Sequence, residues 1–252
     1  MMAADVSFDY VLGLADDALI LGHRLSEWCG HAPLLEEELA LANIGLDLIG
    51  WARRLYDYAG VLEGQGRDQD ALAYRRDVAA FRNLLLVEQP NGDFAMTIAR
   101  QFLYAAYAAP LWRAMAGSRD ATMAAIASEA RHEAAYHLRH AGEWLARLGD
   151  GTEESHRRAQ AAIDALWPYT GEMFEANDTL AALVADGIAA SPVTVRAEWD
   201  EAVSIALARS TLARPAGGWM QSGGRRSRHS EHLGHILAEL QFLQRAYPAA
   251  TW

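Results

Sequence analysis

Apolar residues recur along most of this chain at the three- and four-residue spacing of an amphipathic α-helix. Alternating runs of valine, isoleucine and threonine, which would indicate strands, are missing. Stretches rich in glycine, proline and small polar residues interrupt the helical pattern. The sequence therefore predicts an all-α fold, with helices near residues 5–29, 35–62, 70–86, 93–116, 120–148, 153–174, 179–188, 193–212 and 230–246.

Two of the longest predicted helices carry clear apolar stripes. The stripe of the helix at 35–62 consists of Leu41, Ile44, Gly45, Leu48, Ala52, Leu55, Ala59 and Leu62. Its small members, Gly45, Ala52 and Ala59, allow a facing helix to approach closely. The stripe of the helix at 120–148 consists of Met123, Ala127, Ala130, Ala134, His137, Leu138, Ala141, Leu145 and Leu148.

Four predicted helices are long enough to form a bundle of two hairpins, namely 5–29, 35–62, 93–116 and 120–148. We expect one domain over residues 1–252, with a core bundle over about 5–150 and further helices over about 153–246. The content of 52% hydrophobic and 22% charged residues suits one globular domain with a full core.

The net charge and the cysteine content indicate which partners and which cellular compartment to expect. The formal net charge of −11 has the wrong sign for binding nucleic acid or an anionic membrane surface, so neither is expected as a partner. No apolar stretch approaches the ~18 residues that span a bilayer. The single cysteine, Cys29, cannot form an internal disulfide, and we expect it to pack at a helix end. Because the N-terminus also has neither a basic start nor an apolar run, we expect a cytoplasmic protein.

Helical bundles of this size often hold a di-iron centre, which needs two inward-pointing Glu-x-x-His motifs and further carboxylates. A literal match within one of the long predicted helices lies at Glu129 and His132. At about 100° per residue, His132 lies roughly opposite the apolar stripe and Glu129 about 110° from its centre, so both are expected to face solvent. His137 points inward, but the residue three positions before it is Ala134.

The helix at 35–62 offers no metal ligands on its inward face. Its inward positions are Gly45 and Leu48, while Asp47 and Asn43 lie on a flank or on the far side. Nucleophile-elbow, Walker and dinucleotide-binding patterns are missing. The sequence therefore predicts no metal ligand and no catalytic residue, with His137 as a vestigial ligand position.

A second group of histidines precedes and enters the last predicted helix: His229, His232 and His235. At positions i, i+3 and i+6 they could converge on one metal only with strained rotamers, and Glu231 is the only carboxylate nearby in sequence. We interpret this group as a structural helix start.

Two charged clusters have both an ordinary and a functional interpretation. Asp16 and Asp17 could be surviving metal ligands, but charges flanking a buried stripe usually reach water, and we expect that here. Arg225, Arg226 and Arg228 fit a solvated loop. Guanidinium groups also suit phosphates or an acidic partner, so this second interpretation stays open.

Four long strings carry a resemblance to a known family: RLSEWCGHAPLLEEELALANIGLDLIG (24–50), NLLLVEQPNGDFAMTIARQ (83–101), EAAYHLRHAGEWLARLGDGT (133–152) and SEHLGHILAELQFLQR (230–245). They closely resemble the family of C subunits of the bacterial ring-1,2-phenylacetyl-CoA epoxidases, and the similarity runs nearly end to end.

The resemblance implies a ferritin-like fold and a structural role beside a related catalytic A subunit, which holds the di-iron site. When the second predicted helix of this chain is aligned with the second helix of the A subunit, Gly45 and Leu48 align with the Glu and the His of one Glu-x-x-His motif. When the fifth helices of the two subunits are aligned, Ala134 and His137 align with the Glu and the His of the second motif. One ligand of four survives in these two motifs, which agrees with the analysis of helix faces.

By this resemblance, the complex uses dioxygen and NADPH electrons from a separate reductase with FAD and iron–sulfur centres to epoxidise the ring of phenylacetyl-CoA. This chain would hold no cofactor, and its partners would be the catalytic A subunit, the reductase and the other subunits of the complex. A homodimer in the absence of the A subunit stays open. The competing hypothesis is an independent metal-dependent oxygenase that uses His137, Asp17 and Glu133 in a rearranged site.

Overall fold

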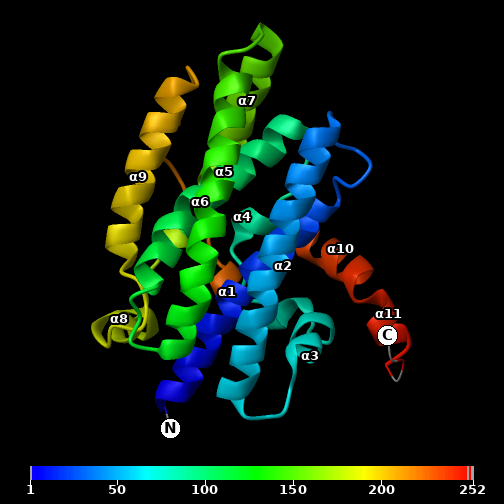
Figure 1. Cartoon of the computed structure of the whole chain (residues 1–252), viewed down its shortest axis with the longest axis vertical. Coiled ribbons are helices and arrows are strands. Elements are labelled where there is room, and N and C mark those ends of the chain that lie inside the picture. The colour runs from blue at the N-terminus through cyan, green and yellow to red at the C-terminus, as the bar shows by residue number, and fades with distance from the viewer. Residues whose placement is uncertain (1, 249, 251–252) are drawn as a thin grey trace. The chain divides into compact units, whose positions relative to one another are not determined.

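A computed structural model describes residues 2–248 and residue 250 of the chain. The described part contains helices and no strand, which confirms the all-α prediction. Short 3-10 turns lie at Val78–Ala80, Trp167–Tyr169, Gly171–Phe174 and Gly224–Arg226. The α-helices are α1 (Met2–Ser26), α2 (Leu35–Glu63), α3 (Gln69–Tyr74), α4 (Leu85–Glu88), α5 (Phe94–Met115), α6 (Ala121–Gly149), α7 (Glu153–Leu166), α8 (Asp178–Ala185), α9 (Pro192–Arg209), α10 (Glu231–Leu240) and α11 (Phe242–Ala246) (Figure 1).

The chain divides into two compact units. Unit 1 combines Met1–Pro90 with Ser222–Trp252, and unit 2 consists of Asn91–Gln221. Each unit contains one of the two expected long hairpins, α1 with α2 in unit 1 and α5 with α6 in unit 2. The expectation of a single domain over residues 1–252 stays a prediction.

Unit 1 is built on the antiparallel pair α1 and α2, which lie side by side (Figure 1). The helices approach closely at Gly22 and Gly45, where a Cβ added to Gly45 would lie 3.3 Å from the Gly22 carbonyl oxygen. The predicted stripe of α2 is buried except for Leu62, which is half-buried. Gly45 therefore permits the close approach of a facing helix that the sequence predicted.

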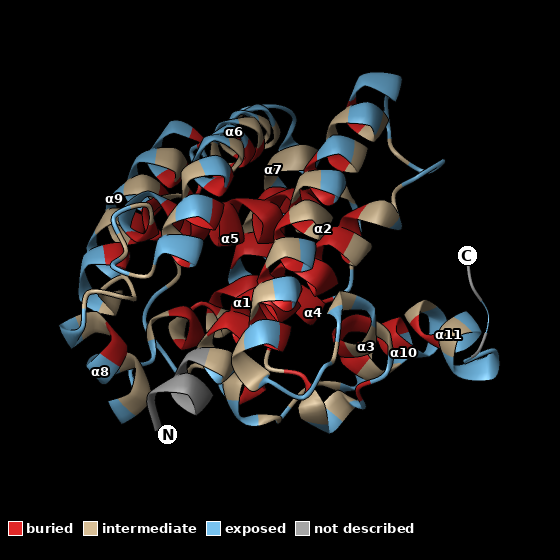
Figure 2. Cartoon of the chain, turned by 60° about the horizontal axis from the view of Figure 1, so that its bottom comes forward, coloured by how far each residue is buried: buried red, intermediate tan, exposed pale blue. Residues whose placement is uncertain are grey.

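Unit 2 is built around α5, which packs against α6, α7 and α9. Residues 97–108 of α5 are all buried, as the red ribbon of Figure 2 shows. A helix that is buried around its whole circumference has a central position in its unit. Among the described residues, no helix combines the length and apolarity that crossing a bilayer needs.

The helix predicted at 70–86 is wrong. The segment forms α3, a 3-10 turn at Val78–Ala80 and α4, with extended backbone at Phe81 and Leu84. Tertiary partners replace the helical hydrogen bonds here. The N–H groups of Arg82 and Leu84 donate to carboxylates on α1, and the Gln241 side chain donates to two carbonyls of the segment.

Two other predicted helices are shorter than expected. The helix at 153–174 ends at Leu166 and continues as two 3-10 turns, because Pro168 has no N–H to donate and disfavours continued α-helix. The helix at 230–246 is divided into α10 and α11 at Gln241, whose side chain is buried among the carbonyls of the 70–86 segment. The other predicted helices occur within a few residues of their expected ends.

The close approach of α1 and α2 gives a first prediction. Replacing Gly45 by Leu forces a side chain against the Gly22 carbonyl and should lower the free energy of unfolding by about 2 kcal/mol, measured by chemical denaturation. Gly50→Leu is the matched control, because the space around Gly50 is open and leucine has the higher helix propensity. Equal stability of the two variants would contradict the close packing.

Candidate functional site

The inward positions of α2 and α6 are where a ferritin-like protein would hold metal ligands. They are Gly45, Leu48, Ala134 and His137, and all four are buried. His137 is 2% exposed, and its ring lies 6.3 Å from that of Tyr136 between centroids. The predicted inward orientation of His137 is confirmed.

The literal Glu-x-x-His motif points away from the core of unit 2. Glu129 and His132 are both exposed on α6, as the helical spacing predicted. On α2, Asn43 is exposed and Asp47 is half-buried, as expected. Among the described residues, no group of three or more His, Cys, Asp or Glu side chains could hold a metal ion. Taken separately, α2 carries no ligand side chain at Gly45 and Leu48, and α6 carries one imidazole and no carboxylate at Ala134 and His137, so neither helix fits its half of a di-iron centre.

Two adjacent buried carboxylates lie elsewhere, on α1. Asp16 and Asp17 are both 0% exposed, so the expectation that they reach water is wrong. Sequence alone placed them beside a buried stripe, but the 70–90 segment and the C-terminal segment of unit 1 cover them. A buried carboxylate needs partners, because transfer out of water costs several kcal/mol.

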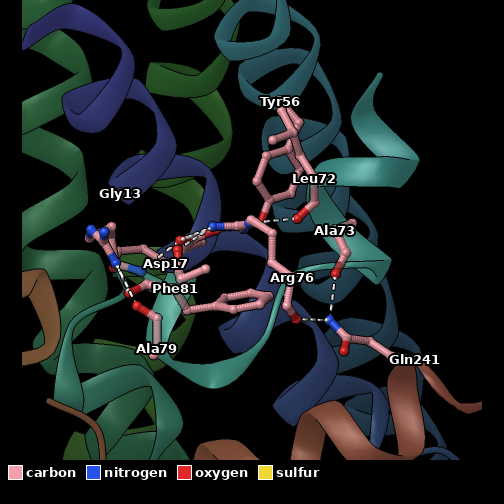
Figure 3. Close-up of polar contacts among 12 residues, drawn as sticks. Gly13, Asp17, Tyr56, Leu72, Ala73, Arg76, Ala79, Phe81 and Gln241 are labelled. Carbon is pink, nitrogen blue, oxygen red and sulfur yellow. Dashed lines mark hydrogen bonds and ion pairs between the residues drawn. The ribbon is translucent and has the colours of Figure 1, made fainter. Parts of the chain in front are cut away.

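Asp16 is paired with an arginine from the segment after α3. Its Oδ1 accepts the Tyr56 hydroxyl at 2.6 Å, and its Oδ2 accepts Arg76 Nη1 at 3.1 Å and the Arg82 N–H at 2.7 Å. Arg76 Nη2 also donates to Oδ1, which makes the ion pair bidentate. The Arg76 guanidinium lies between the rings of Tyr56 and Phe81, 4.1 Å from the Phe81 centroid (Figure 3).

Asp17 is paired with an arginine almost at the other end of the chain. Its Oδ2 accepts Arg225 Nη2 at 2.6 Å, and its Oδ1 accepts Arg225 Nη1 at 3.1 Å and the Leu84 N–H at 2.7 Å. Arg225 Nη1 also lies 2.8 Å from the carbonyl oxygens of Gly13 and Arg82. The guanidinium thus joins α1, the 76–89 segment and the C-terminal segment.

Two glycines make room for this docking. A Cβ on Gly13 would lie 2.8 Å from Arg225 Nη1, and a Cβ on Gly224 would overlap the carbonyl of Asn83. The backbone of the C-terminal segment therefore lies directly against the 83–85 backbone. Only a residue without a side chain permits that approach.

A third buried carboxylate, Glu88, holds the start of α10. Its Oε1 accepts the Ser230 N–H at 2.6 Å, and its Oε2 lies 2.9 Å from Asn83 Nδ2 and 3.0 Å from His229 Nδ1. The other ring nitrogen of His229 lies 3.0 Å from the Phe81 carbonyl, which can only accept, so Nε2 carries a hydrogen. When His229 carries a hydrogen on both ring nitrogens, Nδ1 donates to Glu88 Oε2 and Nε2 donates to the Phe81 carbonyl.

The pKa values of these groups reflect burial and partners. Burial raises the pKa of Asp17 to about 6, against the opposing effects of Arg225 and the Leu84 N–H. Burial alone disfavours the charged form of His229, but the hydrogen bonds to Glu88 and Phe81 outweigh it and raise the pKa of the imidazole. Burial and the Asp16 charge raise the pKa of Tyr56 well above its usual range, so the phenol stays protonated.

We call the residues joined in this way the buried charge network: Asp16, Asp17, Tyr56, Arg76, Glu88, Arg225 and His229. Each carboxylate in it is already engaged by donors of unit 1. This arrangement fixes the C-terminal segment onto α1 and the 76–89 segment, and it leaves no open carboxylate for a metal or for proton transfer to a substrate.

Sequence reasoning missed most of this network. It did not single out Tyr56, Arg76 or Glu88, and it treated Arg225 as part of an exposed cluster. The one available signal was the pair of acids inside the apolar run of α1, from Val11 to Leu25. Such a pair indicates that cations must arrive from elsewhere, but it does not indicate which ones.

The remaining candidate residues are exposed or do not cluster with one another. Arg226 and Arg228 are exposed, in contrast to Arg225. His232 is half-buried and His235 is exposed on α10, so the three histidines of this region do not converge, and His229 belongs to the helix start, as predicted. Cys29 is exposed in the turn after α1, so the expected packing of its thiol is wrong.

Breaking the Asp17–Arg225 pair gives a second prediction. Arg225→Met leaves the buried Asp17 carboxylate without its cation and should lower the free energy of unfolding by about 3 kcal/mol. The double variant Asp17→Asn/Arg225→Met should recover much of that loss, because no unpaired charge remains. Arg226→Met is the matched control and should stay within about 0.5 kcal/mol of the parent protein. Additive losses in the double variant would contradict the pairing.

The His229–Glu88 contact gives a third prediction. Because folding raises the pKa of His229 above its usual value, the folded state binds the proton more tightly, so this contribution is complete below about pH 6.5 and is lost as the pH rises through the folded-state pKa. The thermal midpoint should fall between about pH 6 and pH 8, and His229→Gln should reduce that fall. The exposed His132→Gln should keep the parent pH profile. Coinciding profiles for all three proteins would contradict this assignment.

Comparison with known proteins places the chain in a family. The family described as "Phenylacetic acid catabolic protein" matches residues 2–252. A curated relative from Escherichia coli (strain K12), named as the C subunit of 1,2-phenylacetyl-CoA epoxidase, is 50% identical over 243 residues, which cover 96% of this chain and 98% of that protein. The chain therefore belongs to the phenylacetic acid catabolic protein family, and its role is in phenylacetate catabolism.

Proposed function

We propose that this chain is a noncatalytic structural subunit of a multicomponent phenylacetyl-CoA 1,2-epoxidase and that it stabilises the di-iron catalytic A subunit. The assignment to that complex is supported by the similarity to a named C subunit over nearly the whole of both chains. A protein named as a subunit has partner chains, so a role within an assembly is the natural expectation for its relatives.

One observation carries the noncatalytic part of the proposal. The inward positions of α2 and α6 hold Gly45, Leu48 and Ala134 where ligands would be needed, with His137 as the one exception. Burying apolar side chains within each unit favours folding by roughly 1.5–3 kcal/mol for each large one. The buried carboxylates Asp16 and Asp17 of unit 1, in turn, are engaged by arginines and backbone N–H groups.

The oxidation chemistry is assigned to the partners. We propose that the A subunit holds the di-iron centre and that a reductase with FAD and iron–sulfur centres supplies electrons from NADPH, while this chain holds no cofactor. We expect the assembly in the cytoplasm. The contribution of this chain is to bind and stabilise its catalytic partner and to help shape the route of the substrate.

The competing hypothesis, an independent metal-dependent oxygenase around His137, has no specific observation in its favour. It requires Asp17 as a ligand, but both oxygens of Asp17 accept hydrogen bonds from Arg225, and one also accepts the Leu84 N–H. Glu133, its other carboxylate, is half-buried on α6.

The arginine cluster keeps a narrower proposed role. Arg225 is engaged by Asp17 inside unit 1, so a contact with an acidic partner or with CoA phosphates falls to the exposed Arg226 and Arg228. Arginine suits either ligand through its fork of N–H donors.

Metal content tests the proposed function directly. The chain purified alone, and the complex formed with the A subunit, should be assayed for iron by elemental analysis. We expect well under one iron per copy of this chain when it is alone, and iron in the complex that scales with the amount of the catalytic partner. Stoichiometric iron in the isolated chain would overturn the noncatalytic assignment.

His137→Ala separates the two hypotheses by a second measurement. Because His137 is a buried packing residue, its truncation should lower the thermal midpoint, while epoxidase activity per assembled complex stays near the parent value. The exposed His132→Ala on the same helix is the control. A large loss of activity in a fully assembled complex would favour the oxygenase.

A further inference from the structure

The first half of α2 has a second apolar face, opposite the one that packs on α1. Leu35, Leu39 and Leu46 are 70%, 58% and 65% exposed. At about 100° per residue, the three lie within about 40° of one another, on the side of α2 away from its buried stripe. Leu34, the N-cap residue directly before the helix, is 54% exposed. Figure 2 shows exposed positions along the outer side of α2. We call Leu35, Leu39 and Leu46 the leucine stripe.

Folding of this chain does not account for the leucine stripe. Large exposed leucines contribute little to the stability of an isolated protein, and clustered ones mark interaction surfaces. Leu34 also occupies the N-cap position of α2, where no side chain accepts a helix N–H. By contrast, Asp68, Asp93 and Asp120 cap α3, α5 and α6. A leucine at an N-cap forgoes about 1 kcal/mol of capping.

The charges around the leucine stripe define the chemistry of its partner. Glu36 is exposed beside it, and Glu38 and Asp47 are half-buried on its flanks. No arginine, lysine or histidine occurs between Leu34 and Ala52. The face is therefore apolar with exclusively acidic flanks, and it is complementary to an apolar helix face flanked by arginine or lysine.

Charge also argues against a second copy of this chain as the occupant. In an antiparallel pairing of two such stripes, the acidic flanks of one copy would face the acidic flanks of the other. Like charges brought together in this way oppose association. The face is thus built for a different protein.

We propose that the leucine stripe is the surface by which this chain binds the catalytic subunit of its complex, through a helix of that subunit with an apolar face and basic flanks. This inference rests on the proposed function, because it takes that catalytic protein to be the partner. The stripe extends over roughly 16 Å of helix, so it forms the apolar centre of a larger contact.

The test is the affinity of this full-length chain for the purified catalytic subunit, measured by titration calorimetry. Leu39→Gln/Leu46→Gln keeps helix propensity while removing apolar surface, and it should raise Kd at least about tenfold. Val193→Gln/Ile205→Gln, at two exposed positions of α9, is the matched control and should bind like the parent. Thermal melts of both variants should match the parent.

A second variant tests the charges. Glu36→Arg/Glu38→Arg should weaken binding, and the difference from the parent should shrink as salt is raised, because added ions screen exposed charges. If this variant binds as tightly as the parent at low salt, the acidic flanks do not contribute to binding, and the proposed complementarity with a basic partner is wrong.

The outcomes separate the surface from the function. If the parent chain fails to bind the catalytic subunit, the proposed function itself fails. If the parent and the leucine variant bind with equal Kd, the function stands and the leucine stripe is not the interface. If the parent alone forms a dimer that the leucine variant abolishes, the occupant is a second copy, and the proposal is overturned.

Discussion

The structure of unit 1 depends on two adjacent carboxylates that the fold removes from water. Asp16 and Asp17 lie in the buried part of α1, and each requires a cation and backbone donors. Arg76 and Arg225 supply the cations, while the N–H groups of Arg82 and Leu84 supply further hydrogen bonds. The path of the chain between residues 76 and 89 follows from this requirement, because a continuous helix would use those N–H groups internally.

The same requirement holds the C-terminal segment in unit 1. Arg225 reaches Asp17 across 208 positions of sequence, and Glu88 meets Ser230 across 142. A buried ion pair adds little net stability compared with a hydrocarbon of the same shape, but leaving one partner alone is costly. The network therefore acts mainly by penalising any arrangement in which the C-terminal segment is undocked, and Gly224 permits the close approach that docking needs.

Two properties of α2 connect this architecture to the proposed role. Its inner face is largely hydrocarbon, with Gly45 at the crossing with α1, and the positions Gly45 and Leu48 carry no ligand side chain. Its outer face is also apolar over the first half of the helix, with acidic flanks. A helix with two apolar faces serves two contacts, one within the chain and one beyond it. Such a helix suits a protein that acts by binding its partner.

The sequence by itself determined the all-α class, the two long hairpins, the buried stripe of α2 and the orientations of Glu129, His132 and His137, because all of these follow from local periodicity. Only the tertiary structure decided the break at 70–86, the burial of Asp16 and Asp17 and the engagement of Arg225. Periodicity assigns a residue to a face of its own helix, but it does not indicate which distant segment will cover that face. A buried charge is neutralised by partners far along the chain, so its environment is known only when the chain is folded.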